Sequence, residues 1–122
     1  MNRVWIVVDA LVVLLFVGIG RSSHHHGLRF SGVVSTTWPF ATGLVLGWLY
    51  VTLRRQDGAS LKGGVAVWLF TVIVGMIVRV LFGQGTALAF IIVALGFLGA
   101  LMLGLRALAA RYLRWRRERV SV

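Results

Sequence analysis

The chain has no cysteine, and only three of its 122 residues are acidic. The absence of cysteine excludes disulfide bonds, thiolate metal sites and cysteine nucleophiles. The shortage of acid leaves a formal net charge of +10. Charged residues of both signs make up 13% of the chain and hydrophobic residues 59%, whereas a soluble domain carries about 25% charged residues. A water-soluble domain of this length cannot bury so much apolar surface, and the composition therefore predicts a membrane protein.

Four apolar runs make up most of the chain, with short connections between them. They cover residues 4–20, 33–53, 64–82 and 86–110, and a membrane-spanning helix needs about 20 mainly apolar residues. Gly83-Gln84-Gly85 suits a tight reversal, because glycine accepts a positive φ. No small-residue cleavage site follows Gly20, so we expect the first run to be retained. The predicted fold is a single all-α integral membrane domain of four transmembrane helices in an antiparallel bundle, followed by a basic tail at 111–122.

The basic residues predict the orientation of this bundle, because Lys and Arg collect on the cytoplasmic side. One side holds nine of them: Arg3, Arg54, Arg55, Lys62, Arg111, Arg114, Arg116, Arg117 and Arg119. The other side holds three: Arg21, Arg29 and Arg79. We therefore expect a multi-pass protein of the cytoplasmic membrane with both termini in the cytoplasm. Since the basic residues lie at the ends of apolar runs, we expect no nucleic-acid partner. The tail is expected to attract anionic lipid headgroups.

Glycines within the spans are candidates for helix packing, because helices in lipid associate through close contacts between small residues. Gly43 and Gly47 form a GxxxG pair in the second span, Gly75 lies in the third, and Gly96 and Gly99 lie in the fourth. One interpretation is packing within a four-helix bundle. The other is a homo-oligomer that associates through one of these faces.

Asp9 is the only acid inside any of the four runs, and a carboxylate in hydrocarbon is costly. It lies six residues after Arg3, or about 9 Å along a helix, and Arg106 lies five residues before Arg111, or about 7.5 Å. Both residues should therefore lie at a similar depth, where they can form an ion pair between the first and fourth spans. The alternatives are a titratable carboxylate in a proton- or cation-coupled pathway, and an Asp9 side chain that reaches the membrane surface alone.

A second group of polar residues is expected at the opposite, outer side: Arg21, Ser22, Ser23, His24, His25, His26, Thr36, Thr37, Arg79, Gln84 and Thr86. The candidate binding residues there are Arg21, His24, Arg79 and Gln84, together with Trp38. In one interpretation Arg79 reaches up to the interface. In the other, Arg21 and Arg79 frame an outward-facing pocket for an anion or a lipid headgroup. The three consecutive histidines at 24–26 have side chains that diverge, and no acid lies near them. We therefore predict no metal site and no cofactor.

Trp38 marks the outer end of the second span, since tryptophan is enriched at membrane interfaces. Pro39 follows it directly. Proline is tolerated in the first turn of a helix, and Thr36 or Thr37 can supply an N-cap. We therefore predict that the second helix begins here, and that Pro39 causes no kink within the membrane.

The ordered set of these motifs resembles one family of small membrane proteins, filed as domain of unknown function 3054 and found in bacteria and haloarchaea. The resemblance extends over about residues 4–110, and it implies a four-helix membrane protein with no assigned activity. Its motif residues include Asp9, Arg21, His24, Trp38 and Arg79. The motifs that carry it are Gly20-Arg21-Ser22-Ser23-His24, Trp38-Pro39-Phe40, Gly47-Trp48, Trp68-x-x-Thr71, Gly75-Met76 with Arg79, Gly83-x-Gly85 and Phe90-x-x-Val93-Ala94.

Two function classes follow from these features. The first is a small transporter or channel, because four spans with an acid in the first resemble the small multidrug resistance exporters in outline. The second is a non-transport protein that binds lipid, or that acts as a scaffold or assembly subunit. We predict that the chain is not an enzyme and has no catalytic residues, because it contains neither Gly-x-Ser-x-Gly nor His-Glu-x-x-His.

Overall fold

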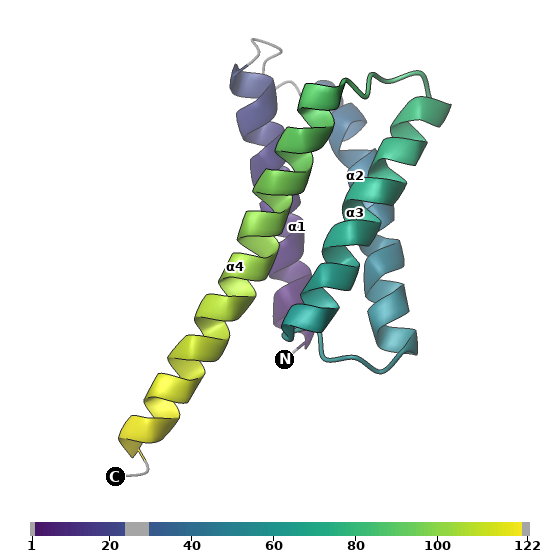
Figure 1. Ribbon diagram of the computed structural model, residues 1–122. Coiled ribbons are helices and arrows are strands. Elements are labelled where there is room, and N and C mark those ends of the chain that lie inside the picture. The colour runs from purple at the N-terminus through teal and green to yellow at the C-terminus, as the bar shows by residue number, and fades with distance from the viewer. Residues whose placement is uncertain (1, 24–29, 121–122) are drawn as a thin grey trace.

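Four helices account for almost all of the chain that the computed structural model describes, namely residues 2–23 and 30–120. They are α1 (Asn2–Ser23), α2 (Phe30–Leu53), α3 (Leu61–Leu81) and α4 (Leu88–Val120). The beginning of α1 and the 54–60 connection lie at one end of the molecule, which we call the tail end (Figure 1). The 82–87 connection lies at the other end, which we call the pocket end, and α4 projects well beyond the tail end (Figure 1).

Three helical segments are long and apolar enough to cross a membrane: Arg3–Ser22, Leu61–Leu81 and Leu88–Val120. The predicted all-α, membrane-like character of the chain is confirmed at this level. Helix α2 is long enough at 24 residues, but it contains several hydroxyl groups, most of them in its first half, which lowers its hydropathy. Two of these hydroxyls bond within the helix, from Thr36 to the Gly32 carbonyl at 3.0 Å and from Thr42 to the Trp38 carbonyl at 2.9 Å.

The GxxxG pair lies where α2 packs against α3. A Cβ atom at Gly43 would lie 2.6 Å from the backbone oxygen of Phe70, and one at Gly47 would lie 3.0 Å from the Cα of Val67. Real Cβ atoms essentially never show the contact at Gly43, so that position needs glycine, and the contact at Gly47 is tighter than most real Cβ contacts. In this chain the pair serves contact between two neighbouring helices of one bundle, as expected where small residues let backbones approach.

The other predicted packing glycines divide into two groups. A Cβ at Gly75 would lie 2.8 Å from the Phe40 ring, and one at Gly99 would lie 2.8 Å from the Trp68 indole. Gly96 departs from the expectation of packing within the bundle, because it is exposed and nothing lies within 4 Å of its Cβ position. The reason is its place on α4, on the side whose residues Ile92, Val93 and Ala100 are also exposed.

The ends of α3 follow local chemistry. Ser60 caps the N-terminus, and its hydroxyl accepts a hydrogen bond from the Gly63 amide at 3.0 Å. At the other end Gly83 has a φ of 73°, which agrees with the positive φ expected for the reversal there. The backbone N–H of Gln84 then donates to the backbone carbonyl of Arg79 at 2.7 Å, a bond typical of helix ends closed by a left-handed glycine.

Pro39 does not mark the start of α2, and this prediction was wrong. The helix begins nine residues earlier, at Phe30, so Pro39, Thr36 and Thr37 all lie inside it. Because proline has no N–H, the carbonyl four residues earlier loses its helical donor. That carbonyl belongs to Ser35, and it accepts a hydrogen bond from Nε2 of Gln84 at 3.2 Å. The proline thus exposes an acceptor that α2 uses to hold the connection between α3 and α4.

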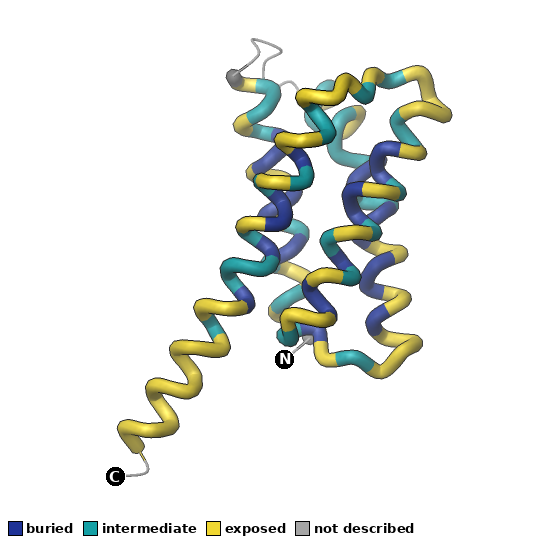
Figure 2. Tube along the Cα trace, viewed as in Figure 1, coloured by how far each residue is buried: buried dark blue, intermediate teal, exposed yellow. Residues whose placement is uncertain are grey.

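An aromatic cluster fills the middle of the bundle. The Phe16 ring from α1 meets Phe40 of α2 at a centroid distance of 5.6 Å, and meets Phe90 and Phe97 of α4 at 5.9 and 5.5 Å. The buried residues lie along the inner sides of all four helices, whereas the end of α4 is exposed (Figure 2). Toward the tail end the core continues through Val12, Val13, Leu98 and Met102, all of them buried.

Candidate functional site

The first candidate site is a buried ion pair between α1 and α4. Nη2 of Arg106 lies 2.7 Å from Oδ2 of Asp9, and Nη1 of Arg106 lies 2.9 Å from Oδ1. Both side chains have 0% of their surface exposed. Two parallel N–H to oxygen bonds form the bidentate arrangement that gives Arg–carboxylate pairs their strength and direction. The structure therefore brings together the two charged residues whose depths matched in the sequence.

The remaining polar atoms of the pair also have partners. The Trp48 indole N–H from α2 donates to Oδ2 of Asp9 at 3.1 Å. Nε of Arg106 donates to the Gly58 carbonyl at 2.7 Å, and Nη1 donates to the Met102 carbonyl at 3.1 Å. The guanidinium carbon also lies 4.7 Å from the centre of the Trp5 ring. A buried pair is tolerated only when such extra bonds satisfy its charges, and this condition is met here.

Sequence reasoning missed three members of this arrangement. Trp48 had a detectable signal, because it lies six residues before Arg54, or about 9 Å, which is the depth computed for Asp9. Gly64 had no detectable signal in the sequence. It makes room for the Arg106 side chain, because a Cβ at this position would lie 2.6 Å from Cδ of Arg106. The Gly58 carbonyl had no signal either, because a backbone acceptor in a connection carries no side-chain signature. Together these contacts bring all four helices and the 54–60 connection around one charge pair.

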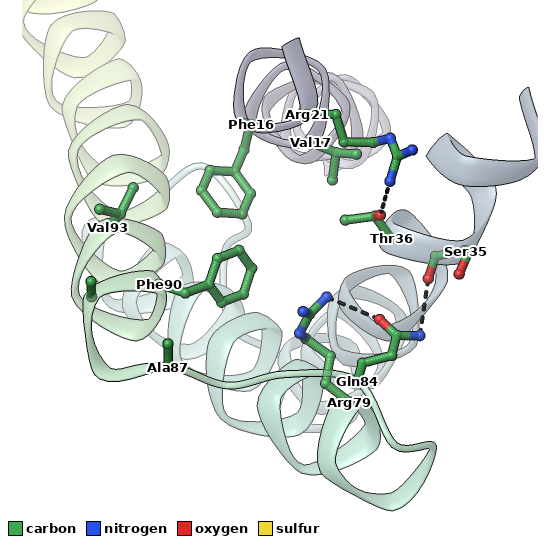
Figure 3. Close-up of a pocket in the computed structure, with 12 residues that line it drawn as sticks. Phe16, Val17, Arg21, Ser35, Thr36, Arg79, Gln84, Ala87, Phe90 and Val93 are labelled. Atoms are coloured by element: carbon green, nitrogen blue, oxygen red, sulfur yellow. Dashed lines mark hydrogen bonds between the residues drawn. The ribbon is translucent and has the colours of Figure 1, made fainter. Parts of the chain in front are cut away.

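The second candidate site is a pocket of about 600 Å³ at the opposite end of the bundle. Figure 3 shows it with a polar side and an apolar side. Residues from all four helices and from the 82–87 connection line it: Phe16, Val17, Gly20, Arg21, Ser35, Thr36, Arg79, Gln84, Ala87, Ala89, Phe90 and Val93. Its volume lies within the range of about 300–1,000 Å³ that is typical of small-ligand sites.

Two arginines dominate the polar side. Nη1 of Arg21 donates to the Thr36 hydroxyl at 3.0 Å, and its guanidinium packs so closely on Gly32 that a Cβ there would overlap it. Arg79 donates from Nε and Nη2 to the Gly85 carbonyl at 2.9 and 2.7 Å, and from Nη1 to Oε1 of Gln84 at 3.0 Å. Hydrogen bonds therefore fix both guanidinium groups beside the cavity (Figure 3).

The apolar side is formed by Phe16 and Phe90, whose rings lie next to each other on one side of the cavity, together with Val17 and Val93 (Figure 3). The guanidinium carbon of Arg79 lies 4.5 Å from the centre of the Phe90 ring. Phe90 thus belongs to both sides. A pocket with this division suits a ligand that is apolar over most of its length and polar at one end.

The pocket and the ion pair are separated by packed side chains. Phe16 and Phe90, which line the pocket, also belong to the aromatic cluster with Phe40. Asp9 lies seven residues before Phe16 on α1, or about 10 Å further along the axis. The buried residues Val12 and Val13 occupy the interval. The two candidate sites are therefore independent features of the described structure.

The other residues singled out in the sequence lie as follows. Trp38 packs edge-on against Phe82 with ring centroids 4.8 Å apart, close to the pocket end, but it does not line the cavity. Gln84 does line it and bridges α2 and α3 through Ser35 and Arg79. His24 and the two histidines after it lie outside the described residues. Within the described residues, no group of three or more His, Cys, Asp or Glu side chains is placed to hold a metal ion.

Comparisons with known proteins agree with the resemblance seen in the sequence. Residues 6–109 match the family model described as "Protein of unknown function (DUF3054)". No curated protein and no solved structure matches the chain. Because the matched region covers most of the 122 residues, and includes both charged residues of the buried pair and both arginines of the pocket, the chain belongs to the DUF3054 family of proteins of unknown function.

Proposed function

We propose that this protein is a four-span integral membrane protein of the cytoplasmic membrane that binds a lipid-like ligand at its pocket end and does not transport solutes. Both termini lie in the cytoplasm and the pocket faces outward in this proposal. Of the two function classes that the sequence left open, the geometry favours the non-transport class. No enzymatic role is proposed.

The difference between the two ends of the bundle is the observation that carries the proposal. The pocket end has a cavity of about 600 Å³. The tail end has an ion pair with both side chains fully buried and bonded to each other through two contacts. A proton or cation pathway needs a carboxylate that solvent reaches and that exchanges its partner. Asp9 instead lies on the tail-end side of the aromatic cluster and accepts hydrogen bonds from side chains of α2 and α4.

The proposed topology includes α2 as the fourth span. Its 24 residues correspond to about 36 Å, which is enough to cross the hydrocarbon core of about 30 Å. Bonds from two threonine hydroxyls to carbonyls one turn earlier reduce the polarity that α2 presents to lipid. The nine basic residues assigned to the cytoplasmic side all belong to the tail end, which supports an inward-facing tail end.

A transport assay tests this proposal against its main competitor. The purified protein is reconstituted in liposomes that contain a pH-sensitive dye, and a proton gradient is imposed with and without a potassium gradient. We expect the proton gradient to dissipate at the same rate as in protein-free liposomes. Proton flux that is lost in Asp9→Asn but kept in Asp57→Asn, a matched change in the exposed 54–60 connection, contradicts the proposal and favours a transporter.

Two partner predictions extend the proposal. The exposed end of α4 is proposed to contact anionic headgroups of the inner leaflet through its five arginines, Arg111, Arg114, Arg116, Arg117 and Arg119. Each basic residue near such a surface contributes about 1 kcal/mol of attraction. The second predicted partner is another copy of the chain in a homo-oligomer. Sedimentation or mass measurement of the protein in a neutral detergent tests its oligomeric state directly.

A further inference from the structure

We propose that the ligand of the pocket is an amphiphile with one anionic head group, held by Arg21 and Arg79, with its apolar chain lying against Phe16, Phe90 and Val93. This inference rests on the proposed lipid-binding function and names the chemical class of its ligand. Membrane lipids whose phosphate head group carries a net negative charge, such as phosphatidylglycerol, and free fatty acids both have this chemistry.

The charge of the pocket is the first argument. Two guanidinium groups line it, and none of the chain's three acids, Asp9, Asp57 and Glu118, is among its lining residues. The groups that Arg79 bonds are a backbone carbonyl and a neutral amide. The contrast with the tail end is direct, because there the buried guanidinium of Arg106 has a carboxylate from its own chain. A cation within a membrane protein is normally paired, and an anionic ligand would give Arg79 a charged partner at the pocket end.

The arrangement of donors is the second argument. Arg21 comes from α1 and Arg79 from α3, and both extend toward the polar side of the cavity, near Thr36 and Gln84 (Figure 3). The Thr36 hydroxyl and the Gln84 amide hold these groups in place. Guanidinium groups fixed in this way present planar, directional donors, which suit the oxygens of a phosphate or carboxylate.

The apolar wall is the third argument, and it selects an amphiphile over a free anion. Phe16 and Phe90 form one side of the cavity. Val93 lines the cavity and is also 56% exposed, beside the exposed Ile92 and Leu88 on the outer surface of α4. The wall of the pocket is therefore continuous with the apolar surface that α4 presents to lipid. An inorganic anion has no apolar surface to place against such a wall, whereas the acyl chain of an amphiphile stays in apolar surroundings when it moves there from lipid.

The test uses the full chain in a neutral maltoside detergent and measures which lipid it binds and where. The probes are phosphatidylglycerol, phosphatidylcholine, oleate and inorganic phosphate, each titrated separately and followed by native mass spectrometry. A phosphatidylglycerol analogue with a photoreactive diazirine in its acyl chain locates the bound lipid by peptide mapping. This readout separates binding in the pocket from binding to the basic end of α4.

The variants are Arg21→Gln, Arg79→Gln and their combination, with Arg79→Lys as the variant that keeps the charge but loses the planar fork. The matched control combines Arg54→Gln with Lys62→Gln, because it also removes two positive charges, but from exposed positions at the tail end. Far-UV circular dichroism and the melting temperature show whether each variant is folded. Arg21→Gln is the safer single change, since Arg79 also holds the 82–87 connection.

We expect phosphatidylglycerol and oleate to bind at least about tenfold more tightly than phosphatidylcholine, because hydrogen bonds to charged groups contribute about 1.5–3 kcal/mol each. We expect the photoreactive lipid to label residues 16–20 or 87–93. This preference and labelling should be lost in the double pocket variant and kept in the tail-end control.

Equal binding of phosphatidylcholine, or labelling unchanged by the double pocket variant, overturns the anionic ligand but leaves a lipid-binding function standing. Inorganic phosphate binding as tightly as the lipids overturns the amphiphile. Proton flux in the liposome assay overturns the proposed function itself, so the two failures are distinguishable.

Discussion

Replacing Asp9 by asparagine is the change whose effect on stability follows most directly from the structure. The amide keeps the size of the carboxyl group but removes its charge. Arg106 then stays fully buried, and it also donates to the backbone carbonyls of Gly58 and Met102, which carry no charge. Removing one partner of a buried ion pair typically costs about 3–5 kcal/mol, because the other charge is left uncompensated. We expect Asp9→Asn to lower the free energy of unfolding by this amount.

A double-mutant cycle separates the pair from its surroundings. Arg106→Met should also cost about 3–5 kcal/mol, since it removes the positive charge from beside the buried carboxylate and leaves it the neutral Trp48 indole N–H as a donor. In the double variant Asp9→Asn with Arg106→Met, no charge is buried. The remaining cost comes from two groups, at about 1–2 kcal/mol each. The Gly58 carbonyl loses its bond from Nε of Arg106, and the asparagine amide introduced at position 9 is imperfectly paired. The double variant should therefore cost about 2–4 kcal/mol, well below the sum of the single changes.

The assay is reversible unfolding in mixed micelles of dodecyl maltoside and dodecyl sulfate, followed by far-UV circular dichroism. Asp57→Asn is the control, because the exposed Asp57 uses an oxygen that asparagine also has to accept the Ala59 amide. It should change the free energy of unfolding by less than about 0.5 kcal/mol. If Asp9→Asn stays within about 1 kcal/mol of the unchanged protein, or if the two single changes add up in the double variant, the reasoning about the buried pair is refuted.

Three further changes test the packing in the same unfolding assay. Gly43→Leu should cost at least about 1–3 kcal/mol through overpacking, because its Cβ would lie 2.6 Å from a backbone oxygen. Gly96→Leu should cost almost nothing, because its Cβ position is open. Equal effects of the two changes would contradict the packing. Trp48→Phe should cost about 1.5–3 kcal/mol by removing the indole N–H that reaches Asp9, and no change would mean that this bond is dispensable. Ser60→Ala removes the N-cap of α3 and should cost about 1 kcal/mol, whereas Ser60→Asp, which retains a capping oxygen, should not.

Arithmetic along the helix axis was enough to predict the pairing of Asp9 and Arg106. A rise of 1.5 Å per residue places two charged residues at similar depth when each is counted from the basic end of its own span. The same arithmetic applies to Trp48, but an indole inside an apolar run does not stand out as a carboxylate does. The Gly58 carbonyl and the space at Gly64 depend on how the 54–60 connection folds back, which no local pattern encodes.

The pocket end was harder to predict. Arg21, Arg79 and Gln84 were recognised as one polar group, because all three lie at the same ends of their spans. Their bonding depends on Pro39, which was expected at the start of α2. A helix propensity argument favours that position, but the helix begins at Phe30 instead. The consequence, a free Ser35 carbonyl that Gln84 reaches, follows from the proline only once the helix boundary is known.

The central claim is that the bundle opens outward at the pocket end and has its sealed ion pair at the cytoplasmic end. The chain has no cysteine, so single cysteines report without interference when intact cells are treated with a membrane-impermeant maleimide. Ser35→Cys, at an exposed position that lines the pocket, should react from outside. Asp57→Cys, in the 54–60 connection, should react only after the membrane is opened. Labelling of position 57 on intact cells, with position 35 reacting only after lysis, contradicts the account.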